Sequence, residues 1–245
     1  MISLRKDNNI YTLYLENKPV NALSLEFVYE LSELIDEISN NNNLKGLILA
    51  SNLKHFCAGA DLKERASMTK EESVDAVYAI KLLVTKILNF DSPTLSLING
   101  ACLGGGLELA SSCDFRLCSN DAVFAFPETS LGIIPGAGGT QLLSRIIGLT
   151  NAKEMIFSGK RINSKTALSY GLVSNVVRNS QLFEYGLKQM EELCSNSSLA
   201  IRAAKRSINE GYNLDIKTAL NIEFKEYVKT LDSKERLDAL KKYKK

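Results

Sequence analysis

The chain contains a segment in which a buried strand, a tight turn and a glycine-rich helix start follow one another: Thr94-Leu95-Ser96-Leu97-Ile98-Asn99-Gly100-Ala101-Cys102-Leu103-Gly104-Gly105-Gly106-Leu107-Glu108. Its first five residues are apolar or small, which is typical of a strand buried on both faces. Asn-Gly is a strong turn signal, and consecutive glycines allow the backbone to approach a neighbour or a ligand closely. We therefore predict a strand at 94–98, a turn at 99–100 and a helix that begins near Gly105.

A similar succession occurs earlier in the chain. The apolar strand 46–50 is followed by the small-residue loop Phe56-Cys57-Ala58-Gly59-Ala60-Asp61 and by a helical region from about 62 to 90. Repeated strand–strand–helix turns favour a stacked spiral over one flat open sheet. The predicted fold class is therefore α/β, with a spiral of ββα units that is followed by helices.

The other segments fit this scheme. Residues 2–16 alternate as a hairpin, and a helix that opens at Ser24 carries apolar residues at helical spacing. Further strands are predicted at 115–118, 123–126 and 172–177, and a helix at 137–147. Beyond about residue 150 the pattern is otherwise helical, and the last segment, 232–245, is a lysine-rich helix.

Composition narrows the class of protein. The 245 residues include 30 basic and 28 acidic side chains, and the net charge of +2 argues against a dedicated nucleic-acid-binding protein. The five cysteines include no Cys-x-x-Cys pair, so we expect free buried thiols in a reducing compartment. No apolar run is long enough to cross a membrane, and the first residues lack the apolar stretch of a secretory signal. These features predict a cytoplasmic protein without membrane contact.

The two small-residue loops suggest a site for a negatively charged oxygen. If the loops 58–60 and 104–106 each turn one N–H toward a common point, the two amides form an oxyanion hole. One such donor is worth about 3–4 kcal/mol of transition-state stabilisation. The second loop opens a helix, whose N-terminal partial positive charge adds to the effect. Either loop taken alone is better explained as an ordinary tight turn.

Two glutamates lie beside these loops. Glu108 falls in the first turn of the predicted helix, where the dipole favours the ionised carboxylate and hence a proton acceptor. Glu128 follows Pro127 in an apolar stretch that should desolvate its carboxyl group and raise its pKa. Two carboxylates in different environments can divide the work, one activating water and the other delivering a proton. The alternative for Glu108 is an ordinary glutamate at a helix N-terminus, and the alternative for Glu128 is a solvated turn residue.

Other catalytic motifs do not match. The stretch 136–139, Gly-Ala-Gly-Gly, lacks the spacing and the Lys-Ser/Thr pair of a P-loop, and the glycines of 100–106 do not have dinucleotide-binding spacing. His55 is the only histidine, so a metal site or a Ser-His-Asp triad is disfavoured. We interpret His55 as a loop residue and expect no metal.

Taken together and in this order, the motifs resemble the crotonase superfamily, and most closely enoyl-CoA hydratase. The resemblance covers essentially the whole chain, and it is carried by the stretches 56–63, 99–110, 113–114, 126–128 and 131–141. It implies a crotonase-type spiral of ββα units over residues 1–190, which holds the active site. It also implies a C-terminal helical region, 191–245, for oligomerisation or for covering the site. Superfamily members usually assemble as trimers or as dimers of trimers, so the resemblance implies a homotrimer or homohexamer.

The resemblance also implies roles for single residues. Ala60 and Gly105 match the oxyanion-hole positions that hold the thioester oxygen. Glu108 matches the residue that activates the water added to C3 of a trans-2-enoyl-CoA, and Glu128 matches the donor of the proton to C2. The positions that match contacts to CoA or to the catalytic water are Ala58, Ala60, Asp61, Leu62, Lys63 and Gly136. Coenzyme A is part of the acyl-CoA substrate, so no separate cofactor is implied.

Several activities stay open at this point. Two glutamates favour hydration, or the reverse dehydration, over a Δ3,Δ2-enoyl-CoA isomerase that moves a proton with one carboxylate. A hydratase for a modified acyl group, such as methylglutaconyl-CoA, is a further alternative. In a different class, a crotonase-fold protein could bind RNA or lack catalysis, with the lysine-rich end 241–245 as a contact. A solvated helix end explains those lysines better.

Overall fold

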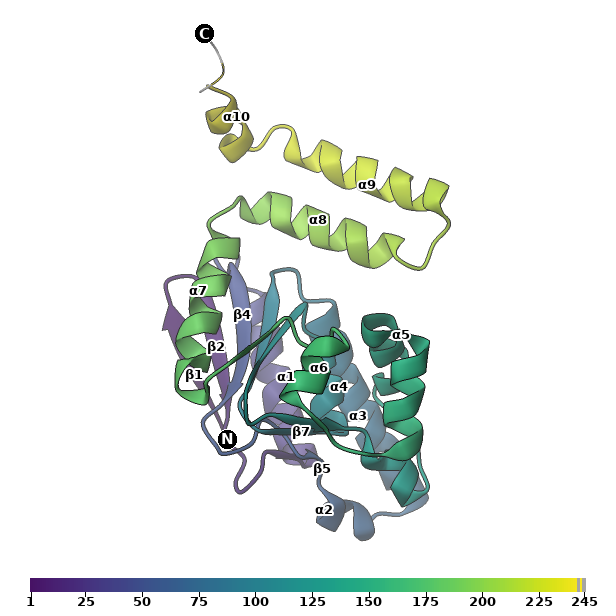
Figure 1. Ribbon diagram of the computed structural model, residues 1–245. Coiled ribbons are helices and arrows are strands. Elements are labelled where there is room, and N and C mark those ends of the chain that lie inside the picture. Colours follow the sequence, from purple (N-terminus) through teal and green to yellow (C-terminus); the bar gives the residue numbers. More distant parts are fainter. Residues whose placement is uncertain (242, 244–245) are drawn as a thin grey trace.

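Strands that alternate between a large sheet and two small sheets organise most of the chain (Figure 1). The computed structural model describes residues 1–241 and 243. The large sheet has the strand order β1 (Ile2–Asp7), β2 (Ile10–Leu15), β4 (Gly46–Ser51), β6 (Thr94–Ile98), β8 (Phe115–Ser119) and β11 (Asn175–Val177). β1 pairs antiparallel with β2, and the other neighbours run parallel.

The second strand of each repeat is short and lies outside the large sheet. A three-stranded sheet contains β10 (Ile162–Asn163), β9 (Val123–Ala125) and β7 (Ala101–Leu103), and β3 (Ala22–Leu23) pairs in parallel with β5 (Gly59–Ala60). An isolated bridge between Cys57 and Cys102 links the two small sheets. The chain thus repeats β2-β3-helix, β4-β5-helix, β6-β7-helix and β8-β9-helix, which confirms the predicted spiral of ββα units.

Helices follow the short strands of the repeats. They are α1 (Leu25–Ser39), α2 (Leu62–Ala66), α3 (Lys70–Leu88), α4 (Gly105–Ser111) and α5 (Gly139–Ser158), with the 3₁₀ helix η1 (Pro127–Leu131) before α5. The predicted helical region 62–90 is therefore divided into two helices. α5 begins two residues later than predicted and continues to Ser158 through a non-helical Gly148, whose φ of 77° interrupts the helix.

The described part of the chain beyond α5 consists of helices and turns, apart from the short strands β10 and β11. It contains α6 (Ser164–Ser169), η2 (Asn179–Gln181), α7 (Leu182–Cys194), α8 (Ser198–Gly211), α9 (Ile216–Thr230) and α10 (Lys234–Lys241). The strand predicted at 172–177 is shorter than expected and begins at Asn175.

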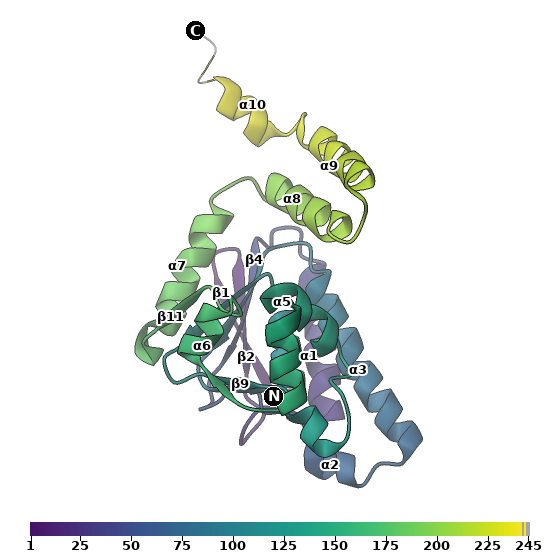
Figure 2. The same cartoon turned by 45° about the vertical axis from the view of Figure 1, so that its right-hand side comes forward.

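Helices lie on both faces of the large sheet (Figure 2), and apolar side chains are buried against each face. α1 begins at the predicted cap, where Ser24 Oγ accepts a hydrogen bond from Phe27 N, and its apolar stripe is buried in the main core. On the opposite face, Met190 of α7 packs with Ile48 and Leu97 of the sheet. Each fully buried side chain of this kind contributes about 1.5–3 kcal/mol relative to an exposed one.

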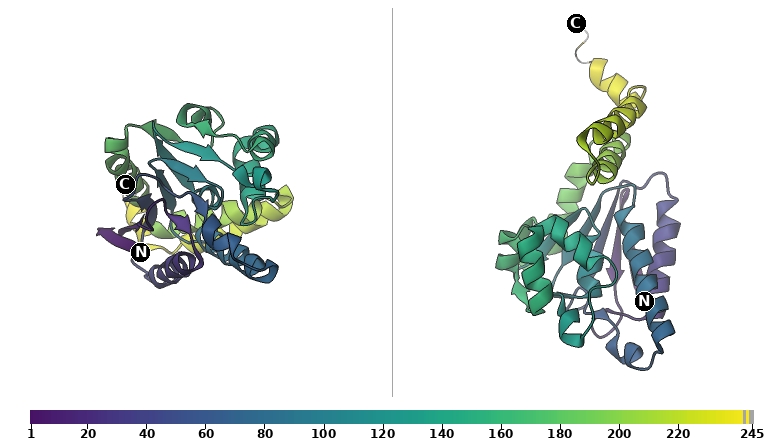
Figure 3. Two further views of the ribbon diagram at one scale, coloured as in Figure 1. Left: turned by 90° about the horizontal axis from the view of Figure 1, so that it is seen from below. Right: turned by 90° about the vertical axis from the view of Figure 1, so that its right-hand side faces the viewer.

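The helices α8, α9 and α10 project from one end of the sheet as an arm (right panel of Figure 3). α8 and α9 form an antiparallel hairpin, and α10 continues away from the core (Figure 1). Many apolar side chains on this arm are exposed, including Ile208, Tyr212, Ile216, Leu220, Phe224 and Tyr227. The arm therefore presents an apolar surface that the described part of the chain does not cover.

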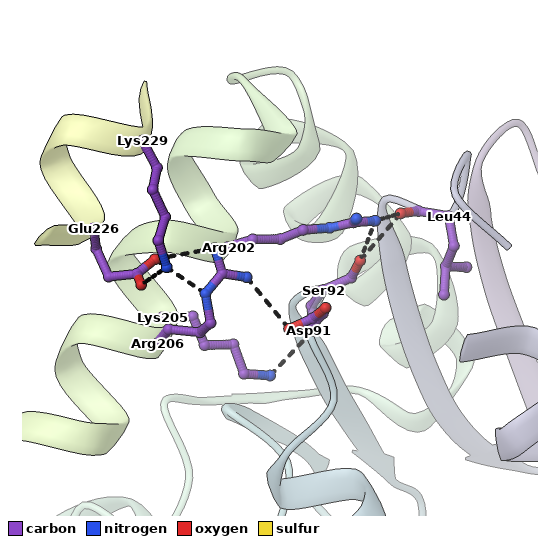
Figure 4. Close-up of polar contacts among 8 residues, drawn as sticks. All are labelled: Leu44, Asp91, Ser92, Arg202, Lys205, Arg206, Glu226 and Lys229. Carbon is purple, nitrogen blue, oxygen red and sulfur yellow. Dashed lines mark hydrogen bonds and ion pairs between the residues drawn. The ribbon is translucent and has the colours of Figure 1, made fainter. Parts of the chain in front are cut away.

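Basic side chains of α8 fasten the arm to the core (Figure 4). Arg202 Nη2 donates to the carbonyl oxygen of Leu44 at 2.6 Å and to Ser92 Oγ at 3.1 Å. Lys205 Nζ lies 2.7 Å from Asp114 Oδ2 and 3.0 Å from the carbonyl oxygen of Ser92. These contacts tie one face of α8 to loops at the end of the large sheet.

Two further sequence predictions can be compared with the structure. The five cysteines are free and buried, as predicted. Within the described residues, no helix is long and apolar enough to cross a membrane. The lysine-rich helix ends at Lys241, and the possible RNA contact at its end depends on residues 242, 244 and 245, which lie outside the described residues.

Candidate active site

The first turn of α4 supplies free backbone N–H groups. Gly104 precedes the helix with φ 49° and ψ −123°, a conformation that glycine adopts at little cost, and its own N–H donates to the carbonyl oxygen of Ala125 at 2.9 Å. Gly105 and Gly106 are the first helical residues, so their N–H groups have no acceptor within the helix. Gly105 therefore combines an available N–H with the positive end of the helix dipole.

The loop that carries Ala60 lies against this helix start. Ala58 N donates to Val20 O at 3.1 Å, and Asp61 N donates to Leu23 O at 3.4 Å. Gly59 lies between these two bonds with φ 91°, which changes the direction in which successive amides point. A Cβ on Gly59 would lie 2.8 Å from the carbonyl oxygen of Leu103, so a side chain would collide there.

The two predicted oxyanion residues are neighbours in space. A Cβ placed on Gly105 would lie 3.7 Å from Ala60 N, and a Cβ placed on Gly59 would lie 3.3 Å from Gly105 N. The absence of a side chain at 59 permits this approach, because a Cβ there would collide with Leu103 O. The structure thus brings Ala60 and Gly105 together, as two backbone donors to one oxygen require.

Glu128 approaches the same helix start from η1. A Cβ on Gly104 would lie only 2.6 Å from Glu128 Oε1, so this carboxyl group packs directly on the glycine backbone. Burial raises the pKa of Glu128 to about 7, and the negative charge of Glu108 acts in the same direction. Glu128 Oε2 is buried and has no hydrogen-bond partner among the described residues. The raised pKa agrees with the prediction made from its apolar surroundings.

Glu108 is held by the loop before α5. Its side chain is buried, with 3% of the residue exposed, and Oε1 accepts hydrogen bonds of 2.8 Å from both Ala137 N and Gly139 N. Burial raises the pKa of Glu108, and the two amide hydrogen bonds oppose this shift. Burial has the larger influence of the two. The sequence prediction that the helix dipole favours the charged form concerns a separate influence and stays a prediction.

The two carboxyl groups and the two amides form one constellation. Glu128 Oε1 lies beside Gly104, and Glu108 Oε2 lies 3.9 Å from the position of a Cβ on Gly105. The charge of Glu108 contributes to the pKa of Glu128, so the two groups titrate as an interacting pair. Paired acids beside two backbone donors are suited to moving protons next to a carbonyl group.

The positions predicted for CoA or water contacts flank this constellation. Ala58 bonds to the β3 segment through its N–H, and Leu62 and Lys63 are exposed at the start of α2. Asp61 Oδ1 caps α2 by accepting from Lys63 N at 2.9 Å, which gives this side chain a structural role that the sequence did not reveal. Gly136 is exposed and precedes Ala137, whose N–H binds Glu108.

Sequence reasoning missed the residues that hold the catalytic candidates in place. Ala137 and Gly139 lie in a glycine-rich stretch that was compared with a phosphate loop and matched to the superfamily, but neither residue was given a role, and their amides bind a carboxylate of the protein itself. Asn21 was not singled out either, although its buried side chain contacts the loop before Ala60. The loop interpretation of His55 is confirmed, since its Nδ1 accepts a hydrogen bond from Ala101 N at 3.2 Å.

Known proteins share this sequence and architecture. The sequence model of the enoyl-CoA hydratase/isomerase family matches residues 5–245. Human mitochondrial methylglutaconyl-CoA hydratase is 39% identical over 229 residues, which cover 91% of this chain and 68% of that protein. Enoyl-CoA isomerase/hydratase fer4 of Mycosarcoma maydis is 41% identical over 195 residues, which cover 79% of this chain and 71% of that protein. The crystal structure of an enoyl-CoA hydratase from Bacillus anthracis matches with a TM-score of 0.96 at 39% identity, covering 99% of this chain and 95% of that chain.

These similarities agree with the observed architecture. The spiral of ββα units with its helical C-terminal part is the fold of the crotonase superfamily. Within that superfamily, the chain belongs to the enoyl-CoA hydratase/isomerase family. The relatives carry names for more than one reaction, so membership supports a hydratase-type enzyme without identifying its substrate.

The raised pKa of Glu128 leads to a prediction about stability. With a pKa of about 7 in the folded chain against the ordinary 4.5, the contribution of the neutral carboxyl group is complete below about pH 4.5 and is lost as pH rises through 7. Relative to Glu128→Gln, the wild type should therefore lose about 1–2 kcal/mol of unfolding free energy between pH 5 and pH 8, a value reduced for partial exposure. Urea unfolding at both pH values measures this difference.

The exposed Glu71 of α3 provides a control for the replacement itself. Glu71→Gln should show no comparable difference from the wild type between the two pH values. A wild type and a Glu128→Gln variant whose stabilities run parallel across this range would contradict the assigned environment of Glu128.

Proposed function

We propose that this protein adds water to the double bond of a trans-2-enoyl-CoA to give a 3-hydroxyacyl-CoA, or catalyses the reverse dehydration. The observation that carries this proposal is the meeting of Glu108 and Glu128 with the amide-bearing residues Ala60 and Gly105 at one helix start. Hydration needs a base for water, an acid for carbon and a place for the thioester oxygen, and these groups supply all three.

In the proposed mechanism the thioester oxygen accepts hydrogen bonds from the N–H groups of Ala60 and Gly105. Glu108 Oε1 is occupied by two amides, which leaves Oε2 to take a proton from water as the water oxygen bonds to C3. Glu128 has a pKa of about 7, so it holds a proton in a substantial fraction of molecules at neutral pH and delivers it to C2. Proton exchange between the coupled pair and solvent then restores the starting state.

The substrate enters this scheme as a CoA thioester, and no additional cofactor takes part in it. We assign the CoA portion to the segment of Ala58, Asp61, Leu62 and Lys63, where the exposed start of α2 adjoins the Ala60 loop. We assign Gly136 to a backbone contact near the catalytic water, because it precedes Ala137, whose N–H binds Glu108. We also place the reaction in a reducing compartment such as the cytoplasm, which the free thiols support.

Two other reactions of the same family are the alternatives. A Δ3,Δ2-enoyl-CoA isomerase needs one carboxylate for its proton shift, whereas this site holds two carboxyl groups in interaction. Hydration of methylglutaconyl-CoA is favoured by the identity of 39% to the human enzyme of that name. Comparing crotonyl-CoA, a 3-enoyl-CoA and methylglutaconyl-CoA as substrates of the purified protein separates the three reactions.

We further propose that the protein assembles as a homotrimer or homohexamer through the C-terminal helical region 191–245, which includes the arm. The exposed apolar side chains of α8 and α9 support this proposal, because a surface of this kind usually marks an interface. The same arm lies at the end of the core to which Lys205 and Arg202 fasten it, so its apolar surface is held at a defined position for a partner copy.

Removing either carboxylate should abolish most of the activity. Glu108→Gln and Glu128→Gln are each expected to lower kcat for crotonyl-CoA hydration by about 10²–10⁴-fold, since each loses one proton transfer. Loss of the enoyl-thioester absorbance measures the rate, and KM should change much less. The Glu71→Gln variant serves as the control. Near wild-type kcat in both site variants would remove the proposed mechanism.

The N–H of Gly105 can be deleted with little cost to the helix. Proline is tolerated at the first helical position, so Gly105→Pro removes the donor while it keeps the helix start. We expect kcat to fall by about 10²–10³-fold, as for other oxyanion donors. Gly105→Ala retains the N–H and brings its Cβ to 3.0 Å from Leu23 Cδ1, so it should lose much less activity. Equal activity of the two variants would argue against the donor role.

The oligomer proposal places Phe224 at a subunit contact. This side chain is 67% exposed on α9, and Phe224→Glu would put a charge into an apolar interface. We expect analytical ultracentrifugation to show a smaller species for Phe224→Glu and the wild-type species for Asn221→Glu, an exposed polar position on the same helix. A monomeric wild type, or unchanged assembly in Phe224→Glu, would contradict the proposal.

A further inference from the structure

Asn21 is a buried polar residue with an uncommon backbone conformation. It has φ 54° and no exposed surface, and its side chain uses both ends of the carboxamide. Oδ1 accepts from Asn17 N at 2.7 Å, which closes a turn within its own segment. Nδ2 lies within 2.8 Å of Ser51 Oγ, 3.1 Å of His55 O and 2.9 Å of Phe56 O. The donor end of Asn21 is therefore directed entirely at another part of the chain.

The loop that Asn21 binds is the one that leads to Ala60. Ser51 extends the contact, because its Oγ accepts from Asn21 and donates to His55 O at 2.7 Å. Cys57, which follows Phe56, donates its Sγ–H to the carbonyl oxygen of Asn21 at 2.9 Å. Burial raises the pKa of this thiol to about 12, so the thiol stays neutral and can donate. Residues 51–57 are thus bonded to Asn21 by its side chain and by its backbone.

The positions of both proposed oxyanion donors depend on Cys57. Ala60 follows it by three residues, across the left-handed Gly59. On the other side, a Cβ on Gly106 would lie 2.4 Å from the carbonyl oxygen of Cys57 and 2.7 Å from its Cβ, so the first turn of α4 rests directly on Cys57. A displacement of residues 55–57 therefore changes the distance between the amides of Ala60 and Gly105.

We propose that Asn21, together with Ser51, is the positioning unit of the oxyanion hole: it holds the carbonyl groups of residues 55 and 56 so that the amides of Ala60 and Gly105 point at one oxygen. This inference rests on the proposed function for its substrate, a CoA thioester. Asn21 itself touches neither the substrate nor the glutamates in this scheme. Its loss misaligns the two amides, and misplacement by about 1 Å can cost about 10²-fold in rate.

The test compares Asn21→Gly with Asn17→Ala. Glycine accepts the φ of Asn21 and deletes only the carboxamide, whereas Asn17→Ala deletes a side chain of the same segment that bonds to Ala22 O and not to residues 51–57. In Asn21→Gly we expect kcat for crotonyl-CoA to fall by about 10–100-fold with KM within about threefold. Asn17→Ala should keep kcat within about twofold of the wild type.

A spectroscopic readout separates positioning from a purely structural role. The probe is 4-dimethylaminocinnamoyl-CoA, a conjugated enoyl thioester whose absorbance moves to longer wavelength when its carbonyl oxygen is strongly hydrogen-bonded. The shift per bound probe is independent of the fraction of protein that is folded. We expect Asn21→Gly to lose at least half of the wild-type shift and Asn17→Ala to retain it.

Ser51→Ala carries the same test if Asn21→Gly does not fold, because it removes the hydroxyl that connects Asn21 with His55 O. In Ser51→Ala the absorbance shift of the bound probe should be smaller than in the wild type, but larger than in Asn21→Gly. A wild-type shift in folded Asn21→Gly, or in folded Ser51→Ala, would overturn the proposal. A wild type that shifts the probe but does not hydrate any enoyl-CoA would instead reject the proposed reaction, while the variants still decide the role of Asn21.

Discussion

The close approach of two backbones at residues 59 and 105 is the constraint on which the candidate site depends. Gly59 has φ 91°, and a Cβ on it would lie 2.8 Å from Leu103 O. The start of α4 is equally crowded, since a Cβ on Gly104 would lie 2.6 Å from Glu128 Oε1. Side chains at these positions would separate the amides from each other and from the carboxyl group. Glycine is therefore required at 59 and 104 both by the short distances between segments of the chain and by the positive φ angles.

The two glutamates show how similar side chains acquire different environments. Both are removed from water, and burial raises the pKa of each. Glu108 receives two backbone N–H groups that partly compensate its charged form, whereas Glu128 Oε2 has no partner in the described part of the chain. The loop before α5 thus distinguishes the two acids by hydrogen bonding, although they lie near the adjacent glycines 104 and 105.

Much of this arrangement could be predicted from the sequence, and the failures have physical causes. The strand at 94–98, the cap at Ser24 and the spiral were predictable because apolar periodicity and turn residues are local signals. The strands β3 and β5 have two residues each, too few for any periodicity. The burial that raises the pKa of Glu108 was not predicted, because it depends on α5 and its loop, which are distant in sequence. The partners of Asn21 Nδ2 lie 30 or more residues away and leave no local pattern.

The fastening of the arm has a mechanical consequence for the rest of the molecule. Asp114 Oδ2, which Lys205 of α8 contacts at 2.7 Å, also accepts from Thr94 N at 2.8 Å. This carboxylate lies just after α4, at the end opposite to Gly105. Lys205 and Asp114 therefore connect α8 with the junction between β6 and the C-terminal end of α4. A contact that displaces α8 would therefore also reach the helix whose first turn forms part of the candidate site.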